Sequence, residues 1–156
     1  MPDYIGQNRC TYNAIAAQFF AKRQIMWESL PPLGQYVQIG DRVLDVGCGF
    51  GRVYHLLKDK KVSYLGIDQS EEQIKKARTV FPDAQFEVGE MTNLAVPNQS
   101  VDVIFCIAAF HHLPSRETRL QALAAMKRAL KPGGYVLMTN WNLYSEWAMK
   151  KLRNYE

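Results

Sequence analysis

After residue 40, the chain alternates between short apolar runs and longer stretches in which apolar residues recur at helical spacing. The apolar runs have the length of strands, and they span 43–46, 64–67, 85–88, 101–107 and 135–139. Helical spacing covers 52–57, 70–80, 116–130 and 145–153. Strands that alternate with helices predict an α/β fold, built on a doubly wound, mostly parallel sheet with right-handed crossovers.

Side chains at the ends of two predicted helices refine this pattern. Ser70 is the predicted N-cap of helix 70–80, and Gln73 stands where it would complete a capping box. The proline and glycines of 131–134 end helix 116–130 before the last strand. The residues of that helix that we expect to face the core are Leu120, Leu123, Met126 and Leu130.

The first 40 residues have a different character. We expect an amphipathic helix or helix pair from about Thr11 to Trp27, which the prolines and glycine of 30–34 interrupt. A chain of 156 residues is long enough to bury one core. The sequence therefore predicts a single domain over 1–156, with a helical cap at 1–40 and an α/β core at 41–156.

Composition and charge are those of a soluble globular protein, because apolar residues make up 47% of the chain and charged residues 22%. No apolar run approaches the roughly 20 residues of a membrane span, and the amino end lacks the apolar stretch of a signal peptide. The three cysteines form no C-x-x-C pair, so we expect reduced thiols, a cytoplasmic location and no metal site. A net charge of +4 permits a nucleic-acid partner without demanding one.

Glycines follow the first strand at a spacing that indicates a nucleotide site. Residues 45–51 read D-V-G-C-G-F-G. Glycine lets the backbone turn tightly and approach a ligand closely. A dinucleotide fingerprint would need a glycine where this chain has Arg52, so a dehydrogenase is not favoured.

An acidic residue at the end of the second strand supports the same site. Asp68 lies 21 residues after Gly47. A carboxylate at about this spacing can accept hydrogen bonds from both hydroxyls of a ribose. Because the carboxyl ends of parallel strands meet at one edge of the sheet, we expect Asp45–Gly51, Asp68, Glu90 and Cys106–His112 to share one cleft.

This arrangement resembles motif I of the class I S-adenosylmethionine (SAM) dependent methyltransferases, whose sheet is Rossmann-like. The resemblance extends from Tyr12 to Trp141 and includes L-K-P-G-G at 130–134. It implies that SAM is bound and released as S-adenosylhomocysteine. Motif I would contact the methionine part, Asp68 with Gln69 the ribose, and the residues after the third strand the adenine. The cofactor-binding residues that it implies are Asp45, Gly47, Cys48, Gly49, Gly51, Asp68, Gln69, Glu90, Met91 and Cys106.

A narrower resemblance concerns the acceptor. Y-N-A-I-A at 12–16, followed by Lys22, Arg23 and Trp27, is similar to the amino end of the eukaryotic tRNA wobble-uridine carboxymethyl methyltransferases. I-A-A-F-H-H-L at 107–113 and Trp141 also match that family. Its members methylate a carboxylate on the wobble uridine of tRNA and produce a methyl ester.

Three kinds of side chain are candidates for catalysis and acceptor binding. His111 and His112 follow the fourth strand, although a hydrogen bond within the loop would also explain either one. Arg23 could anchor a carboxylate of the acceptor or of SAM, or it could be an exposed helix residue. Trp141 could stack on a base or pack at the cleft mouth. A carboxylate acceptor is already ionised at neutral pH, so it would need no general base.

The partners and the competing functions remain open at this point. The basic residues 127, 128, 131, 150, 151 and 153 could contact phosphates or be solvated. The family usually has seven strands, so the sheet expected here lacks the last two, and a dimer mate, another partner or the terminal helix would cover its edge strand. A small-molecule O- or C-methyltransferase and a non-catalytic SAM-binding scaffold are the alternatives to a tRNA enzyme.

Overall fold

The computed structural model describes residues 3–22, 30–142 and 144–145. Five parallel strands form one sheet: β1 (Arg42–Val46), β2 (Ser63–Asp68), β3 (Gln85–Val88), β4 (Val101–Ile107) and β5 (Leu130–Thr139). Their order is β3-β2-β1-β4-β5, so the direction of strand addition reverses between β1 and β4. This is the predicted α/β fold, and the reversal is the place where such sheets open a ligand crevice.

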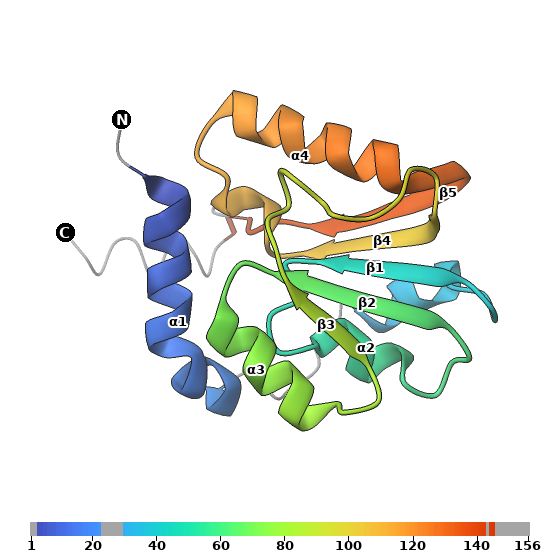
Figure 1. Cartoon of the computed structure of the whole chain (residues 1–156), viewed down its shortest axis with the longest axis horizontal. Helices are drawn as coiled ribbons and strands as arrows, with labels where there is room; N and C mark the ends of the chain where they lie inside the picture. The colour runs from blue at the N-terminus through green and yellow to red at the C-terminus, as the bar shows by residue number, and fades with distance from the viewer. Residues whose placement is uncertain (1–2, 23–29, 143, 146–156) are drawn as a thin grey trace.

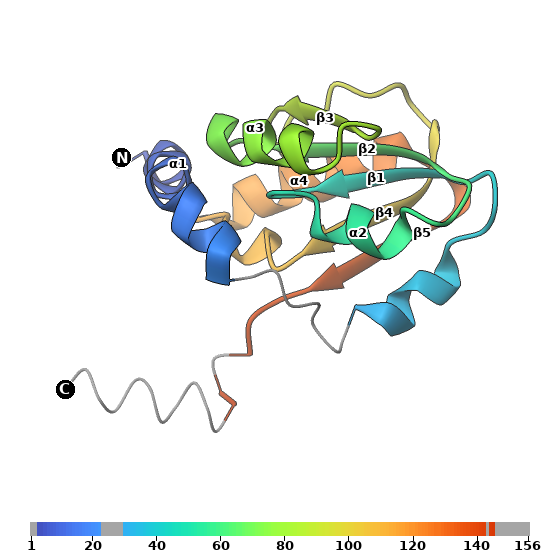
Figure 2. The same ribbon diagram turned by 90° about the horizontal axis from the view of Figure 1, so that it is seen from below.

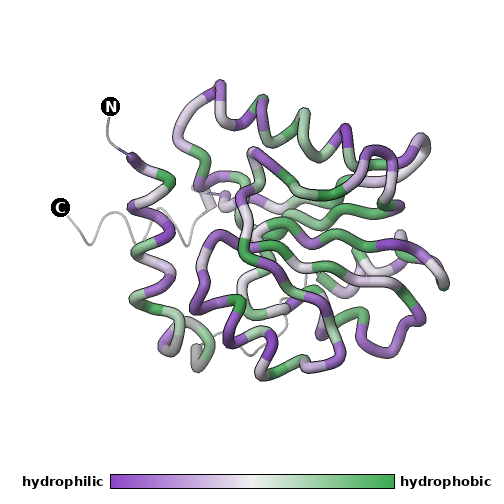
Figure 3. Tube along the Cα trace, viewed as in Figure 1, coloured by the Kyte–Doolittle hydropathy of each residue, from purple (hydrophilic) through white to green (hydrophobic). Residues whose placement is uncertain are grey.

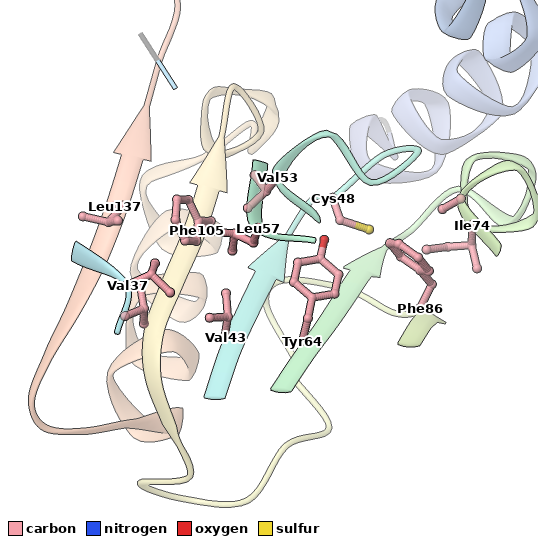
Figure 4. Close-up of a cluster of buried hydrophobic side chains, with 12 residues drawn as sticks. Val37, Val43, Cys48, Val53, Leu57, Tyr64, Ile74, Phe86, Phe105 and Leu137 are labelled. Atoms are coloured by element: carbon pink, nitrogen blue, oxygen red, sulfur yellow. The ribbon is translucent and has the colours of Figure 1, made fainter. Parts of the chain in front are cut away.

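Helices cover both faces of the sheet (Figure 1). The helices α2 (Arg52–Leu57) and α3 (Glu71–Val80) and the 3-10 helix η1 (Pro31–Tyr36) lie on one face, and α4 (Arg116–Ala129) lies on the other. On the first face, Tyr64, Phe86 and Phe105 from the strands pack with Val53, Leu57 and Ile74 from the helices (Figure 4). Figure 3 shows the central strands as mainly hydrophobic and the outer helices as mixed, which is why the sheet is the middle layer.

The amino-terminal helix α1 (Tyr4–Lys22) begins earlier than the predicted Thr11, and Trp27 lies outside the described residues. It packs on α3, beyond the carboxyl ends of the strands (Figure 1 and Figure 2). The helix α1 therefore lies over the crevice, where a helical cap is expected.

The predicted face of α4 is wrong in part. Its buried residues are Ala122, Ala125, Met126 and Ala129, whereas Leu120 and Leu123 are 49% and 42% exposed. Leu130, which we expected at the end of this helix, already belongs to β5 and pairs with Val101. The residues 131–134 form an irregularity in that pairing, and regular register resumes at Tyr135 opposite Val103.

The predicted cap of α3 is confirmed in one half. The hydroxyl of Ser70 accepts a hydrogen bond from the backbone N–H of Gln73, as expected. The side-chain amide of Gln73 is buried and has no hydrogen-bond partner among the described residues, so it does not complete the capping box.

Candidate functional site

A cleft opens at the carboxyl ends of the strands, between the sheet and α1. Of the predicted site residues, the ones that line it are Asp45, Gly47, Cys48, Gly49, Asp68, Gln69, Glu90, Met91, His112 and Trp141. Gly51, Cys106 and His111 do not line it, and Arg23 lies outside the described residues. The structure thus brings together most of the predicted cofactor site and one of the two histidines.

The turn after β1 is fixed to the end of β2. The backbone N–H groups of Gly47 and Cys48 both donate to the carbonyl of Ile67, with N···O distances of 2.7 and 3.1 Å. Gly47 has a φ of +75°, and a Cβ at this position would overlap the Cβ of Ala109. A side chain is therefore excluded where the backbone of β1 meets the loop after β4.

Gly51 and Cys106, which do not line the cleft, have structural roles in the described fold. Gly51 caps α2 with a φ of +91°, and a Cβ there would lie 2.9 Å from both Phe81 and Phe86. Cys106 is fully buried in the core between the sheet and α4. Burial raises the pKa of its thiol to about 12, so the thiol is not reactive at neutral pH.

Asp68 connects the two loops that frame the cleft. Its Oδ2 accepts a hydrogen bond from the N–H of Gly49 at 2.8 Å, and its Oδ1 accepts one from the N–H of Ser70 at 2.9 Å. Burial raises the pKa of this carboxyl, and these backbone hydrogen bonds oppose the shift. A carboxylate oxygen has two acceptor positions, so Asp68 can still receive a diol.

Asp45 is a buried acid in the wall of the cleft. Its Oδ2 accepts a hydrogen bond from the Tyr64 hydroxyl at 2.7 Å, whereas its Oδ1 has no partner among the described residues. Burial is the main cause that raises the pKa of Asp45 to about 7, and the charge of Asp68 adds to it. A buried acceptor without a partner suits a cationic or hydrogen-bonding ligand group.

The chain turns sharply after β4. Ala108 has a φ of +51°, which is uncommon for a residue with a side chain. Its N–H donates to the carbonyl and hydroxyl oxygens of Thr139, at 2.9 and 3.1 Å, which holds this conformation. The turn leads into the short 3-10 helix η2 (Phe110–His112), which brings the two histidines back to the strand ends.

The two histidines have different surroundings. His112 lines the cleft, and its Nε2 lies 2.9 Å from the hydroxyl of Tyr12 on α1. His111 lies between His112 and Trp141, with ring centroids 4.3 and 5.0 Å away. Burial lowers the pKa of His111, and burial together with His111 lowers the pKa of His112 to about 4. Both rings are therefore neutral at pH 7.

The sequence pattern does not reveal the cleft residues of α1 or the hydrogen-bond partner of Asp45. Ile5, Asn8 and Tyr12 line the cleft, and Asn13 binds the turn after β2. Residues 12 and 13 were part of the motif that resembled the tRNA enzymes, but nothing in the local pattern indicated their contacts. Tyr64 belongs to β2 and reads as an ordinary core residue in the sequence.

Two of the candidate phosphate-binding residues are engaged within the protein. Arg128 donates to the carbonyls of Leu94 and Val96 and to Asn98, and Lys131 pairs with Asp102 at 2.7 Å. Residues 150, 151 and 153 lie outside the described residues, which leaves Lys127 as the exposed candidate within them. In the described part of the chain, no group of three or more His, Cys, Asp or Glu side chains could hold a metal, and no helix is long and apolar enough to cross a membrane.

Comparison with known proteins agrees with this geometry. A family model described as a methyltransferase domain matches residues 43–134, which hold β1 to β4 and the start of β5. The chain belongs to this methyltransferase domain family. A solved SAM-dependent methyltransferase from Methanosarcina mazei has the same fold, with a TM-score of 0.69 and 27% identity over 80% of this chain and 64% of that one. The predicted fold class and the predicted family are confirmed.

Two curated relatives have names that specify different methyl acceptors. The tRNA (carboxymethyluridine(34)-5-O)-methyltransferase ALKBH8 of Mus musculus is 32% identical over 142 residues, which are 90% of this chain and 20% of the relative. The 2-methyl-6-phytyl-1,4-hydroquinone methyltransferase of Synechocystis is 34% identical over 119 residues, which are 74% of this chain and 34% of the relative. The chain thus spans between a fifth and a third of the length of these relatives.

Proposed function

We propose that the chain binds SAM in the cleft and transfers its methyl group. The observation that carries this proposal is the convergence of three features: the glycine turn after β1, the Asp68 carboxylate and the unpartnered Oδ1 of Asp45. When bound, SAM supplies a methyl group that is already activated by the sulfonium. The task of the protein is therefore to hold the two reactants in line.

The residues present fit SAM in charge and in hydrogen bonding. Oδ1 of Asp45 is a buried acceptor for the ammonium of the methionine part, and that interaction would favour the ionised carboxylate. Asp68 offers free acceptor positions to the ribose hydroxyls. Met91 gives the cleft an apolar wall after β3, beside Glu90, for an adenine ring.

For the acceptor, we propose a carboxymethyl group on the wobble uridine of tRNA, which would become a methyl ester. The relative from Mus musculus is named a tRNA (carboxymethyluridine(34)-5-O)-methyltransferase, and it matches 90% of the chain. We assign the part of the cleft with His112 and Trp141 as its acceptor end, and this part agrees with the choice because His112 is neutral and Trp141 is half-exposed. A carboxylate nucleophile needs no base, and an exposed indole can stack on a nucleobase.

A small-molecule acceptor is the second candidate, and the Synechocystis relative favours it. Its name specifies a hydroquinone as substrate, and the apolar face of such an aromatic ring could pack on Ile5, Ile107 and Leu113 in the same cleft. The product distinguishes the candidates, because an ester is hydrolysed by mild alkali, whereas ethers and C-methyl groups are not.

The test is to incubate the chain with methyl-labelled SAM and either bulk tRNA or a small-molecule extract. We expect label in tRNA that brief mild alkali releases as methanol. At saturating SAM, the rate should stay flat from about pH 6 to 9, because the acceptor titrates near pH 4. His112→Ala should lower the rate and keep this plateau. Base-stable label, or a rate that rises with a pKa of about 6 to 7, would favour the small-molecule candidate.

A further inference from the structure

The contact between Tyr12 and His112 joins α1 to the acceptor end of the cleft. The Tyr12 hydroxyl and His112 Nε2 are 2.9 Å apart, although the residues are 100 positions apart in the sequence. The rings meet edge to face, with centroids 5.4 Å apart and planes at 79°. Both residues line the cleft, and His112 also lines a second, shallower hollow beside α1.

Chemistry decides which group donates in this hydrogen bond. A neutral imidazole has one N–H and one bare nitrogen, and a phenol can donate or accept. The phenolic O–H is the more acidic donor and the bare imidazole nitrogen is the more basic acceptor, so O–H···N is the favoured arrangement. The proton of a neutral His112 then resides on Nδ1. Among the described residues, burial lowers the pKa of His112 and the charge of His111 lowers it further, so the ring stays neutral.

The part of α1 that carries Tyr12 is held in place by hydrogen bonds between its asparagines and the turn after β2. The side-chain carbonyl of Asn13 accepts from the Ser70 hydroxyl at 2.6 Å, and its amide donates to Glu71 at 2.8 Å. One turn earlier, the carbonyl of Asn8 accepts from the Gln69 amide at 2.6 Å. All three partners directly follow Asp68, so the turn that would hold the ribose also positions α1.

We propose that Tyr12 is a positioning residue that fixes His112 as the neutral Nδ1–H tautomer, so that His112 serves as a hydrogen-bond donor and not as a base. The identity of the acceptor rests on the proposed function, but the tautomer does not. A neutral donor can orient a carboxylate without the strong pairing that a cation would make. This matters because the carboxylate loses its charge in the transition state, and a strong ion pair would favour the ground state.

The direct test is nitrogen NMR of protein labelled with ¹⁵N-histidine. The chain has three histidines, and His→Gln variants at 55, 111 and 112 assign the signals. We expect His112 to be neutral from pH 6 to 8 with the proton on Nδ1. In Tyr12→Phe the donor is lost and the ring should shift toward the Nε2–H form, whereas the matched change Tyr36→Phe on η1 should leave it unaltered. An Nε2–H form in the wild type, or the same tautomer in Tyr12→Phe, overturns the proposal.

Kinetics provide the second readout. Tyr12→Phe should lower kcat about three- to tenfold, the value of one hydrogen bond, with the Kd for SAM unchanged. Combined with His112→Ala it should cause no further loss, since both changes remove the same interaction. If no methyl transfer to tRNA is found, the NMR result still decides the role of Tyr12. If transfer is found but the tautomer is Nε2–H, the proposed function stands and this proposal fails.

Discussion

At the scale of single residues, Asp45 has the most unusual environment in the described structure of the site. It is 1% exposed and lines the cleft; its Oδ2 accepts a hydrogen bond from Tyr64, and its Oδ1 has no partner among the residues that the structure describes. Its ionisation is therefore costly until a ligand supplies a positive charge. The free energy of unfolding of the ligand-free protein should therefore depend on whether Asp45 is ionised, and so on pH.

The folded protein holds the Asp45 proton more tightly than the unfolded chain, because the pKa rises from 3.8 to about 7. Between these pH values the folded state binds more protons, so the free energy of unfolding falls as the pH rises from about 4 to about 7. The loss from this group is up to about 4 kcal/mol at roughly 1.4 kcal/mol per pH unit. Asp45→Asn should flatten that slope in urea unfolding at several pH values, and the exposed Asp59→Asn should not. Equal slopes in wild type and Asp45→Asn would refute this.

Asp68 is the residue on which ribose binding should depend. Replacing it with alanine removes the acceptor for the ribose and for two backbone N–H groups, so we expect SAM binding to weaken by about 1–3 kcal/mol. Titration calorimetry measures the dissociation constant, and thermal unfolding checks that the domain remains folded. Asp83→Ala, an exposed acid in the turn after α3, is the control. An unchanged dissociation constant in Asp68→Ala would remove this residue from the site.

The site residues divide according to how local their signal is. Asp45, Gly47 and Gly49 are neighbours in sequence, and Asp68 ends the next strand, so spacing alone places them together. The contacts of Tyr12 and Asn13 depend on how α1 packs across the strand ends, 57 to 100 residues from its partners. Sequence spacing carries no information about how α1 packs across the strand ends, so it cannot predict the contacts of these residues.

At the scale of elements, α4 shows that side-chain size, more than hydrophobicity, decides which residues of a helix face the sheet. The alanines at 122, 125 and 129 let the helix axis approach the sheet, and Met126 fills the remaining space against Ile104 and Leu44. Larger side chains on that face would force the helix away from the sheet. Hydrophobicity at helical spacing alone predicts Leu120 and Leu123 on the buried face, and both are exposed. An alanine stripe at helical spacing was the better signal.

The last turn of α4 offers a matched pair of basic residues. Arg128 is hydrogen bonded to the loop at 94–98, and its neighbour Lys127 is exposed. Arg128→Ala should lower the free energy of unfolding by about 1–2 kcal/mol, because it leaves the carbonyls of that loop without a donor. Lys127→Ala should change it by less than about 0.5 kcal/mol. Chemical denaturation of both variants checks this, and equal stabilities would mean that the Arg128 contacts contribute nothing.

At the scale of the whole molecule, the described sheet has an open edge. β5 pairs with β4 on one side, and no described strand lies on its other side. Tyr135 and Val136 on this strand are 52% and 39% exposed. Residues 146–153 of the predicted terminal helix, a candidate cover for this edge, lie outside the described residues. An apolar edge with unpaired backbone groups is a template for pairing with another strand.

We expect another chain, such as a second copy of this one, to pair with the open edge of β5. Light scattering after gel filtration should show a dimer whose population rises with concentration. Val136→Lys should shift it toward the monomer, because a charge on an edge strand opposes pairing. Lys127→Ala, on the surface of α4, should leave the dimer intact. A monomer at all concentrations, with β5 amides that exchange hydrogen as fast as those of the loop at 94–98, would contradict this expectation.

The order of the strands along the chain also determines the order in which the site residues are synthesised. The pairing of β1 with β2 begins at residues 42 and 63, and that of β2 with β3 begins at 65 and 85, so these three strands are all synthesised before β4. The other edge of β1 must wait for β4 at 101–107. The residues of the cleft that include Asp45 and Asp68 therefore leave the ribosome before His112 has been translated. At that stage the edge of β1 that will pair with β4 has no partner strand, and we expect it to need protection from aggregation until β4 is made.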